Sequence, residues 1–177
     1  AEKPMATSSP ALYLNADEYN DSGIRVLADG QVQVVDAKSG AVRSTGMLPL
    51  PAGVTVAAVQ EGPVLSGLVG IGLSNGQLLV AKPDYSVSYG ENNARIVTTT
   101  LAYPYGEVPV TIDESGAPLK AFYVRGDEES FKVLAAAGGK IVRLTFAAEA
   151  VEDTGFSLSF GGDESVRKFA VASRDEL

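Results

Sequence analysis

The chain has 177 residues, of which 45% are hydrophobic, and a formal net charge of −8 at pH 7. These values suit one globular domain with a real core, and the acidic balance argues against nucleic acid or an anionic membrane surface as a partner, because both require clustered Lys and Arg. Cysteine and histidine are both absent, which excludes disulfides, thiolate zinc sites, Cys nucleophiles and Ser-His-Asp triads.

The chain opens with a short polar segment and a first β-hairpin. Residues 1–10 have no apolar core, so we expect a disordered leader rather than a signal peptide. A strand is expected over Ala11–Asn15, and Leu27–Val35 then reads Leu-Ala-Asp-Gly-Gln-Val-Gln-Val-Val. Asp-Gly supplies the positive φ angles of a type I′ turn, so this second segment predicts a hairpin.

The same pattern returns further along the chain. Leu73–Ala81 reads Leu-Ser-Asn-Gly-Gln-Leu-Leu-Val-Ala, and an expected strand at Thr55–Val59 precedes it. The turn glycines of the two copies, Gly30 and Gly76, are 46 positions apart. This spacing is close to the roughly 40–45 residues of one WD40 blade, so the repeat predicts blade-like units.

An extra hairpin follows the second copy. Tyr85–Tyr89 alternates Tyr and Val with Ser, which is the period of a strand. Gly90–Asn93 is a turn cluster, and the β-branched run in Arg95–Thr100 predicts a returning strand. We therefore expect a long hairpin that ends in a loop at Tyr103–Glu107.

A third, weaker copy occupies the last part of the chain. A strand is expected at Leu119–Val124, and Ala136–Leu144 repeats the hairpin pattern with its turn at Gly139, 63 positions after Gly76. The longer spacing accommodates the extra hairpin. A fourth start is expected at Ser165–Ala172.

These patterns predict an all-β fold: a partial WD40-like β-propeller with about three antiparallel blades and the start of a fourth. The expected units are 11–50, 51–100, 117–150 and a partial one at 163–177, with Gly30, Gly76 and Gly139 at equivalent hairpins. Helix-forming runs such as Ala147–Ala150 are too short to form helices alone.

Parts of the chain resemble a known family. The matching segments are Ile71–Val80, Tyr85–Tyr89, Ala102–Val110, Ile112–Gly116 and Val34–Gly40. They are similar to the periplasmic insertion of proteobacterial phosphate ABC transporter permeases, over roughly Ala11–Ala150. The string Tyr103-Pro-Tyr-Gly-Glu107 is the more specific part, because many propeller blades carry something like Leu-Ser-Asn-Gly-Gln.

The resemblance implies a non-catalytic extracytoplasmic accessory domain, a protein-interaction or regulatory module, on the periplasmic side of the bacterial inner membrane. It implies as partners the membrane part of the same permease chain, a periplasmic phosphate-binding protein and a partner permease. The translocation path of that family lies in the membrane part, so no transport residue carries over. The alternative is a free-standing periplasmic or secreted propeller-type binding or scaffold protein; a propeller hydrolase is disfavoured because histidine is absent.

Several clusters invite a functional reading, but a simpler one is preferred for each. Asp127–Glu129 and Asp163-Glu164 lie in turns, where exposure keeps paired carboxylates ionised. Asp17–Asp21 is dense in oxygen atoms but lacks the spacing of a calcium loop. Gly67–Gly72 leads into a strand rather than a helix, so it is no phosphate cradle. We expect no catalytic residue, cofactor or metal.

Aromatic residues gather around the extra hairpin. Tyr85, Tyr89, Tyr103 and Tyr105 lie near Arg95, and Tyr and Arg are favoured anchors of protein interfaces. Packing against the propeller is the alternative role and is favoured over docking. These five residues are the candidate partner-binding set.

The repeat count also bears on assembly. Closed propellers have 4–8 blades, so about three blades leave terminal strand edges and apolar flanks uncovered. We expect self-association through the open blade edges.

Overall fold

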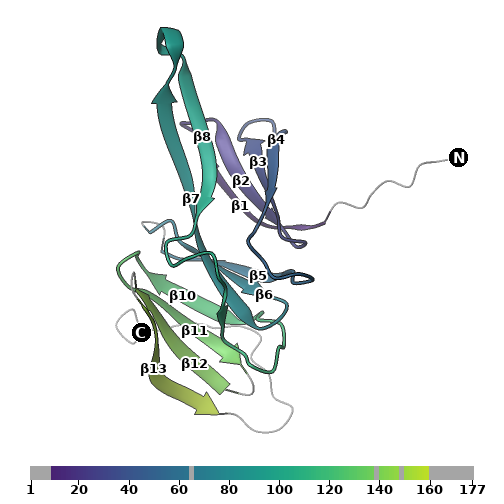
Figure 1. Cartoon of the computed structure of the whole chain (residues 1–177), viewed down its shortest axis with the longest axis vertical. Coiled ribbons are helices and arrows are strands. Elements are labelled where there is room, and N and C mark those ends of the chain that lie inside the picture. The colour runs from purple at the N-terminus through teal and green to yellow at the C-terminus, as the bar shows by residue number, and fades with distance from the viewer. Residues whose placement is uncertain (1–8, 64–65, 138–139, 148–149, 160–177) are drawn as a thin grey trace, which may run out of the picture.

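The computed structural model describes residues 9–63, 66–137, 140–147 and 150–159 (Figure 1). Three antiparallel sheets follow one another along the chain, each with four strands in sequence order. The strands of blade 1 are β1 (Ala11–Asp17), β2 (Ser22–Leu27), β3 (Gln31–Asp36) and β4 (Val42–Met47). Those of blade 2 are β5 (Val56–Glu61), β6 (Val69–Leu73), β7 (Gln77–Tyr89) and β8 (Arg95–Ala102), with the short β9 (Val110–Thr111) paired to β7. Those of blade 3 are β10 (Phe122–Gly126), β11 (Phe131–Ala137), β12 (Lys140–Ala147) and β13 (Ala150–Ser159).

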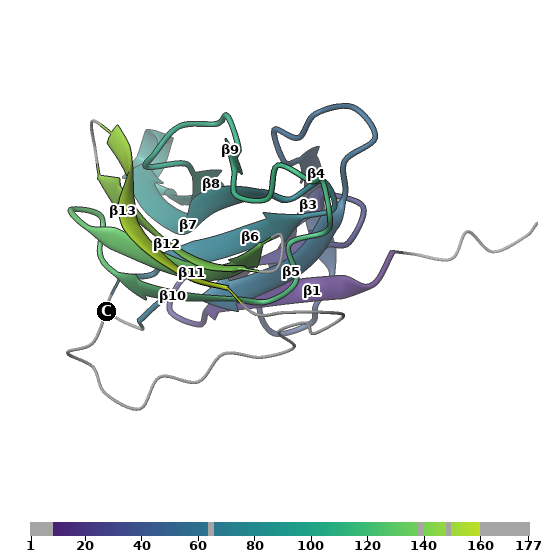
Figure 2. The same ribbon diagram turned by 90° about the horizontal axis from the view of Figure 1, so that it is seen from below.

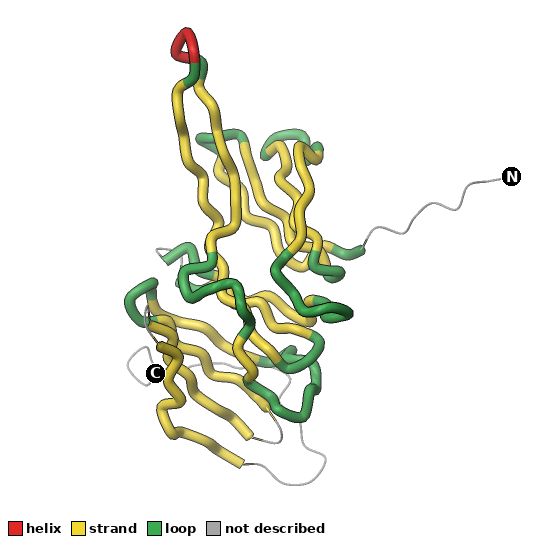
Figure 3. The backbone as a smooth tube through the Cα atoms, viewed as in Figure 1, coloured by secondary structure: helices red, strands yellow, loops and turns green. Residues whose placement is uncertain are grey.

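The expected all-β fold and its three antiparallel blades are confirmed. Strands make up the regular structure of the described residues, and the helical element among them is one short turn, η1 (Glu91–Asn93), drawn in red in Figure 3. The three sheets follow one another down the view of Figure 1, and seen from below they lie one behind another, with blade 3 in front (Figure 2). The expected fourth start at 163–177 and most of the leader lie outside the described residues.

The two clearest sequence copies form equivalent hairpins between the second and third strands of their blades. Gly30 and Gly76 have φ angles of 87° and 80°, whereas Asp29 and Asn75 before them do not have positive φ, so the expected type I′ turn, which needs two successive positive φ angles, is not formed. Each glycine donates its backbone N–H to the leucine that ends the preceding strand, Leu27 or Leu73, at 3.0 and 3.3 Å. The third hairpin lies in the corresponding place, between β11 and β12, although Gly139 itself is outside the described residues.

Two hydrophobic cores lie between the blades. The first joins Ile24 and Val26 of blade 1 to β6 and β7 residues of blade 2, including Ile71 and Leu79. The second joins Leu78 and other blade 2 residues to blade 3. Blade 2 is therefore covered on both faces, and all five residues of β6 are buried.

Close contact between blades 2 and 3 depends on a missing side chain. A Cβ atom on Gly72 would lie 2.7 Å from a ring carbon of Phe122 and closer still to the carbonyl oxygen of Leu119. Hydrogen at this position lets the Phe122 ring and the backbone before β10 pack on β6. The backbone N–H of Leu119 donates to the Leu73 carbonyl at 2.9 Å, which holds this segment in place.

Some predicted boundaries differ from the structure. The strand expected at Leu119–Val124 begins only at Phe122. Leu119 does not pair within the third sheet, because it is buried beside β6 instead. The third sheet also continues to Ser159, past the expected end of its unit at 150, because a fourth strand follows the β12 turn.

Candidate functional site: the arm of the second blade

The predicted long hairpin is present as a projection from blade 2. β7 is 13 residues long. Its first part is a blade strand that pairs with β6 and β9, and from Lys82 to Tyr89 it pairs with β8. Residues 82–102, here called the arm, extend away from blade 2 and run beside blade 1 (Figure 1). At the tip, Asn92 and Asn93 have φ angles of 59° and 57°, a conformation that Asn tolerates better than most residues.

The two faces of the arm differ. Tyr85 pairs with Thr99 and Val87 with Val97, so these residues share one face, and three of them are half-buried. Every residue on the opposite face is exposed, and most of them carry hydroxyl groups: Asp84, Ser86, Ser88, Ile96, Thr98 and Thr100. One face of the arm therefore lies against the protein, and the other is solvated.

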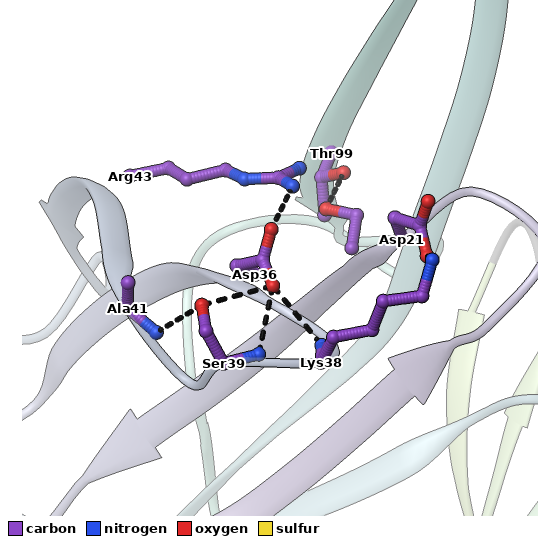
Figure 4. Close-up of polar contacts among 8 residues, drawn as sticks. Asp21, Asp36, Lys38, Ser39, Ala41, Arg43 and Thr99 are labelled. Carbon is purple, nitrogen blue, oxygen red and sulfur yellow. Dashed lines mark hydrogen bonds and ion pairs between the residues drawn. The ribbon is translucent and has the colours of Figure 1, made fainter.

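The covered face is joined to blade 1 by hydrogen bonds. The Tyr85 hydroxyl donates to the Asn15 side-chain oxygen at 2.7 Å. The hydroxyls of Ser22 and Thr99 lie 2.7 Å apart, and Figure 4 shows Thr99 at this contact. Asn15 and Ser22 belong to β1 and β2, so the arm of blade 2 is fastened to the first hairpin of blade 1.

A second set of contacts lies nearer the tip. The Arg95 guanidinium donates to the side-chain oxygen of Asn20 and stacks over the Tyr19 ring, with its central carbon 5.2 Å from the ring centroid. Asn20 is only 8% exposed, and its side-chain N–H donates to the Asp17 carboxylate at 2.6 Å. This β1–β2 turn is the oxygen-rich segment that the sequence offered as a calcium alternative, and its groups serve the joint with the arm. The described residues contain no group of three or more His, Cys, Asp or Glu placed to hold a metal ion.

The tip presents apolar surface to solvent. Tyr89 is 69% exposed and Ile96 48% exposed, while Tyr19 on the neighbouring turn is 85% exposed. Tyr89 pairs with Arg95 in the ladder, so the two residues share one face at the end of the arm, where the Arg95 guanidinium lies over the Tyr19 ring. Such exposed Tyr and Arg side chains are the commonest anchors of protein interfaces.

Tyr103 and Tyr105 have a different environment from the tip. Tyr103 packs against the core between blades 1 and 2. Tyr105 stacks on Phe131, with ring centroids 6.2 Å apart, and its hydroxyl donates to the Asp127 carbonyl at 2.9 Å. The structure thus groups Tyr85, Tyr89 and Arg95 on one face of the arm and leaves the other two members of the predicted set at its base as packing residues.

Burial changes the ionisation of these tyrosines. Desolvation raises the pKa of Tyr85 to about 12, with a further contribution from the negative charge of Asp17. Burial likewise raises the pKa of Tyr103 and of Tyr105 to about 12. All three remain neutral hydrogen-bonding groups at physiological pH, which suits a structural role rather than acid-base chemistry.

A polar turn beside the arm belongs to blade 1. The Asp36 carboxylate accepts the backbone N–H of Ser39 at 2.8 Å and also binds Arg43, and these bonds hold the pKa of that carboxyl well below its usual range. Lys38 pairs with Asp21 at 2.6 Å, which ties this turn to the β1–β2 turn (Figure 4). The cluster fixes the β3–β4 hairpin.

The other sequence clusters are structural where they are described. The Asp127 side chain accepts the backbone N–H of Glu129 at 3.0 Å, as in an Asx turn between β10 and β11. Gly67–Gly72 leads into the buried strand β6 and not into a helix, so it lacks the N-terminal dipole that a phosphate cradle needs. Asp163-Glu164 lies outside the described residues.

The sequence did not point to Asn15, Tyr19, Asn20 or Thr99 as members of the arm site. These residues matter through contacts between two blades, and strand periodicity shows only which residues share a face. The dense polar cluster at 17–21 was the available signal, but its composition alone did not name the arm as the partner.

Taken together, fold and site define an all-β protein of blade-like sheets with a projecting, partly apolar arm. No protein-family model matches the chain, and no curated protein matches it. Among solved structures, the chain is similar to the crystal structure of BBS1N in complex with ARL6DN, at 8% identity and a TM-score of 0.47, with 85% of this chain covered. The chain spans 40% of that structure's chain, and a likeness at this level carries no argument about function. Within the described residues, no helix is both long and apolar enough to span a bilayer.

Proposed function

We propose that this chain is a non-catalytic extracytoplasmic accessory domain of a phosphate-type ABC transporter permease, and that it acts as a protein-interaction module on the periplasmic side of the inner membrane. The arm is the proposed contact surface. The membrane part of the same permease chain, a periplasmic phosphate-binding protein and the partner permease are the proposed partners.

The observation that carries the interaction role is the arm itself. A two-stranded ribbon is marginally stable alone, yet this one is held out from blade 2 by hydrogen bonds to blade 1 while Tyr89 stays 69% exposed. A protein that needed the hairpin only to cover its core would bury this ring. An ordered arm with an exposed aromatic tip is instead typical of a docking element.

The transporter assignment has separate support. One of the segments that resemble the permease insertion, Tyr85–Tyr89, lies in the arm. The others lie in β6 and β7, in the loops around β9 and in the β3–β4 hairpin, and the most specific string, Tyr103–Glu107, follows the base of the arm. The resemblance therefore supports the family assignment for the blades and the arm together, and the arm contact rests on the exposed tip.

The experiment is site-specific crosslinking in the intact membrane protein. A photo-crosslinking amino acid at position 89 should capture the phosphate-binding protein or the partner permease, whereas the same probe at Thr100, on the solvated arm face, should not. Tyr89→Ser should weaken the captured complex by at least about ten-fold, as expected for an interface anchor. Equal capture from both positions would contradict a specific arm contact.

The transporter assignment has its own test. The intact open reading frame should encode membrane helices on both sides of this domain. A reading frame without such helices would favour the free-standing binding or scaffold protein. In that case the crosslinking result would still report whether the arm is a contact surface.

A further inference from the structure

The feature that carries a further inference is the face of blade 1 turned away from blade 2. On this face, alternation along β2 and β3 places Arg25 opposite Gln33. Their neighbours Ile24 and Val26 point the other way, into the core shared with blade 2. Arg25 and Gln33 therefore lie on the outward face of blade 1, whereas Ile24 and Val26 on the opposite face pack against blade 2.

The repeat shows what a covered face looks like at the same positions. Shifting Arg25 and Gln33 by the 46-residue repeat gives Ile71 and Leu79, which also lie opposite each other in β6 and β7. Ile71 is 0% and Leu79 1% exposed, because blade 1 packs on them. Blade 2 thus packs against blade 1 through two aliphatic side chains, and at the same two positions blade 1 carries the guanidinium of Arg25 and the amide of Gln33.

The polar groups on this face satisfy one another. The Nε and one terminal N–H of Arg25 both donate to the Gln33 side-chain oxygen, at 2.9 and 2.6 Å. The Gln33 side-chain N–H donates in turn to Gln31. Burying a charged guanidinium against another sheet without an opposite charge would be costly, whereas this ladder is stable when water covers it.

We propose that Arg25 and Gln33 cap the blade array: they make the outward face of blade 1 a terminal, solvated face on which no further blade packs, whether from this polypeptide or from a second copy. Repeat proteins use polar outer faces on terminal repeats for this purpose. The exposed apolar residues on this face, Leu14 and Met47, are 60% and 64% exposed. Leu27 and Val35, which alternation places on the same face, are 5% and 3% exposed and thus buried without a further blade. Self-association, where it occurs, uses strand edges or the arm instead of this face.

Because the chain has no cysteine, single thiols can report on this face. Thr45 is exposed on β4 opposite Gln33, so Thr45→Cys leaves the ladder intact. In the intact protein its reaction rate with a maleimide should match that of Thr98→Cys on the solvated arm face. Ala81→Cys, in the core between blades 1 and 2, gives the rate of a covered position. A Thr45→Cys rate close to that of Ala81→Cys would overturn the proposal.

The cap can also be removed. The double variant Arg25→Ile with Gln33→Leu introduces the residues of blade 2 and should associate at lower concentration than the parent in sedimentation, with unchanged β-sheet circular dichroism. The matched control, Ser86→Ile with Thr98→Leu, adds two aliphatic residues that pair on the solvated arm face; it should sediment like the parent. A folded double variant that sediments like the parent at every concentration would show that Arg25 and Gln33 do not prevent packing on this face. If the variant does not fold, the thiol rates decide.

Discussion

Replacing Gly72 by Ala should destabilise the protein by forcing blades 2 and 3 apart. The added methyl group would meet the Leu119 carbonyl oxygen and, at 2.7 Å, a ring carbon of Phe122. Both obstacles are held in place, because the Leu119 N–H is bonded to the Leu73 carbonyl and Phe122 is 4% exposed. The methyl group therefore cannot be accommodated by a simple side-chain rotation.

The expected size of the effect follows from this geometry. Overpacking a core typically costs 1–3 kcal/mol, and a backbone obstacle puts this site at about 3 kcal/mol. For a domain of this size, 1 kcal/mol shifts the melting temperature by roughly 2–4 °C, so thermal unfolding followed by circular dichroism should show a loss of about 6–12 °C.

Gly46→Ala provides the matched control. Gly46 lies in a strand, β4, and a Cβ atom there would have nothing within 4 Å. Its stability should stay within about 0.5 kcal/mol of the parent. If Gly72→Ala and Gly46→Ala had the same melting temperature, the close approach of blades 2 and 3 at Gly72 would be refuted.

Three further predictions concern the tyrosines of the arm and its base. Tyr85, Tyr103 and Tyr105 have a pKa of about 12 in the folded protein against 10.0 when free, so the stability that they contribute is complete below pH about 10 and is lost as the pH rises toward about 12. Phenolate absorbance and unfolding should therefore rise together between these two pH values. Full ionisation of a still-folded chain near pH 10 would contradict this prediction. Tyr105→Phe removes a hydroxyl bonded to two backbone carbonyls but keeps the ring packing, and should cost about 1 kcal/mol in denaturant unfolding; no loss would mean that the hydroxyl is bonded equally well by water. Tyr85→Phe removes the bond to Asn15 and should speed hydrogen exchange in the arm, whereas Ser86→Ala on the solvated face should not; equal rates in both variants would refute the joint.

The parts of the fold that were predictable are those fixed by local chemistry. Asn-Gly and Asp-Gly flanked by alternating apolar residues identified the hairpins at Gly30 and Gly76, although the predicted turn type was wrong, because only the glycine of each dipeptide takes a positive φ. The Tyr-Ser alternation identified the arm strand in the same way. Each of these signals lies within about ten residues of sequence.

The parts of the fold that were not predictable depend on contacts between different sheets. Leu119 was assigned to a strand because it is apolar, but it fills the space beside Gly72. The joint between Tyr85 and Asn15 spans 70 residues of sequence, and no local pattern indicates such a contact. Arg25 and Gln33 look like ordinary strand residues in the sequence. Their proposed role becomes visible only when they are compared with the buried Ile71 and Leu79 at the same positions of blade 2.

The attachment of the arm to both blades has a mechanical consequence. Eight residues separate the blade end of β7 from the tip, a reach of roughly 26 Å at about 3.3 Å per residue. Blade 2 holds the root, and contacts with blade 1 follow along the arm, first at Thr99 and Tyr85 and then at Arg95 near the tip. A load applied at Tyr89 is therefore shared by both blades. To move the tip, such a load must break the hydrogen bonds to blade 1 or tilt blade 1 against blade 2.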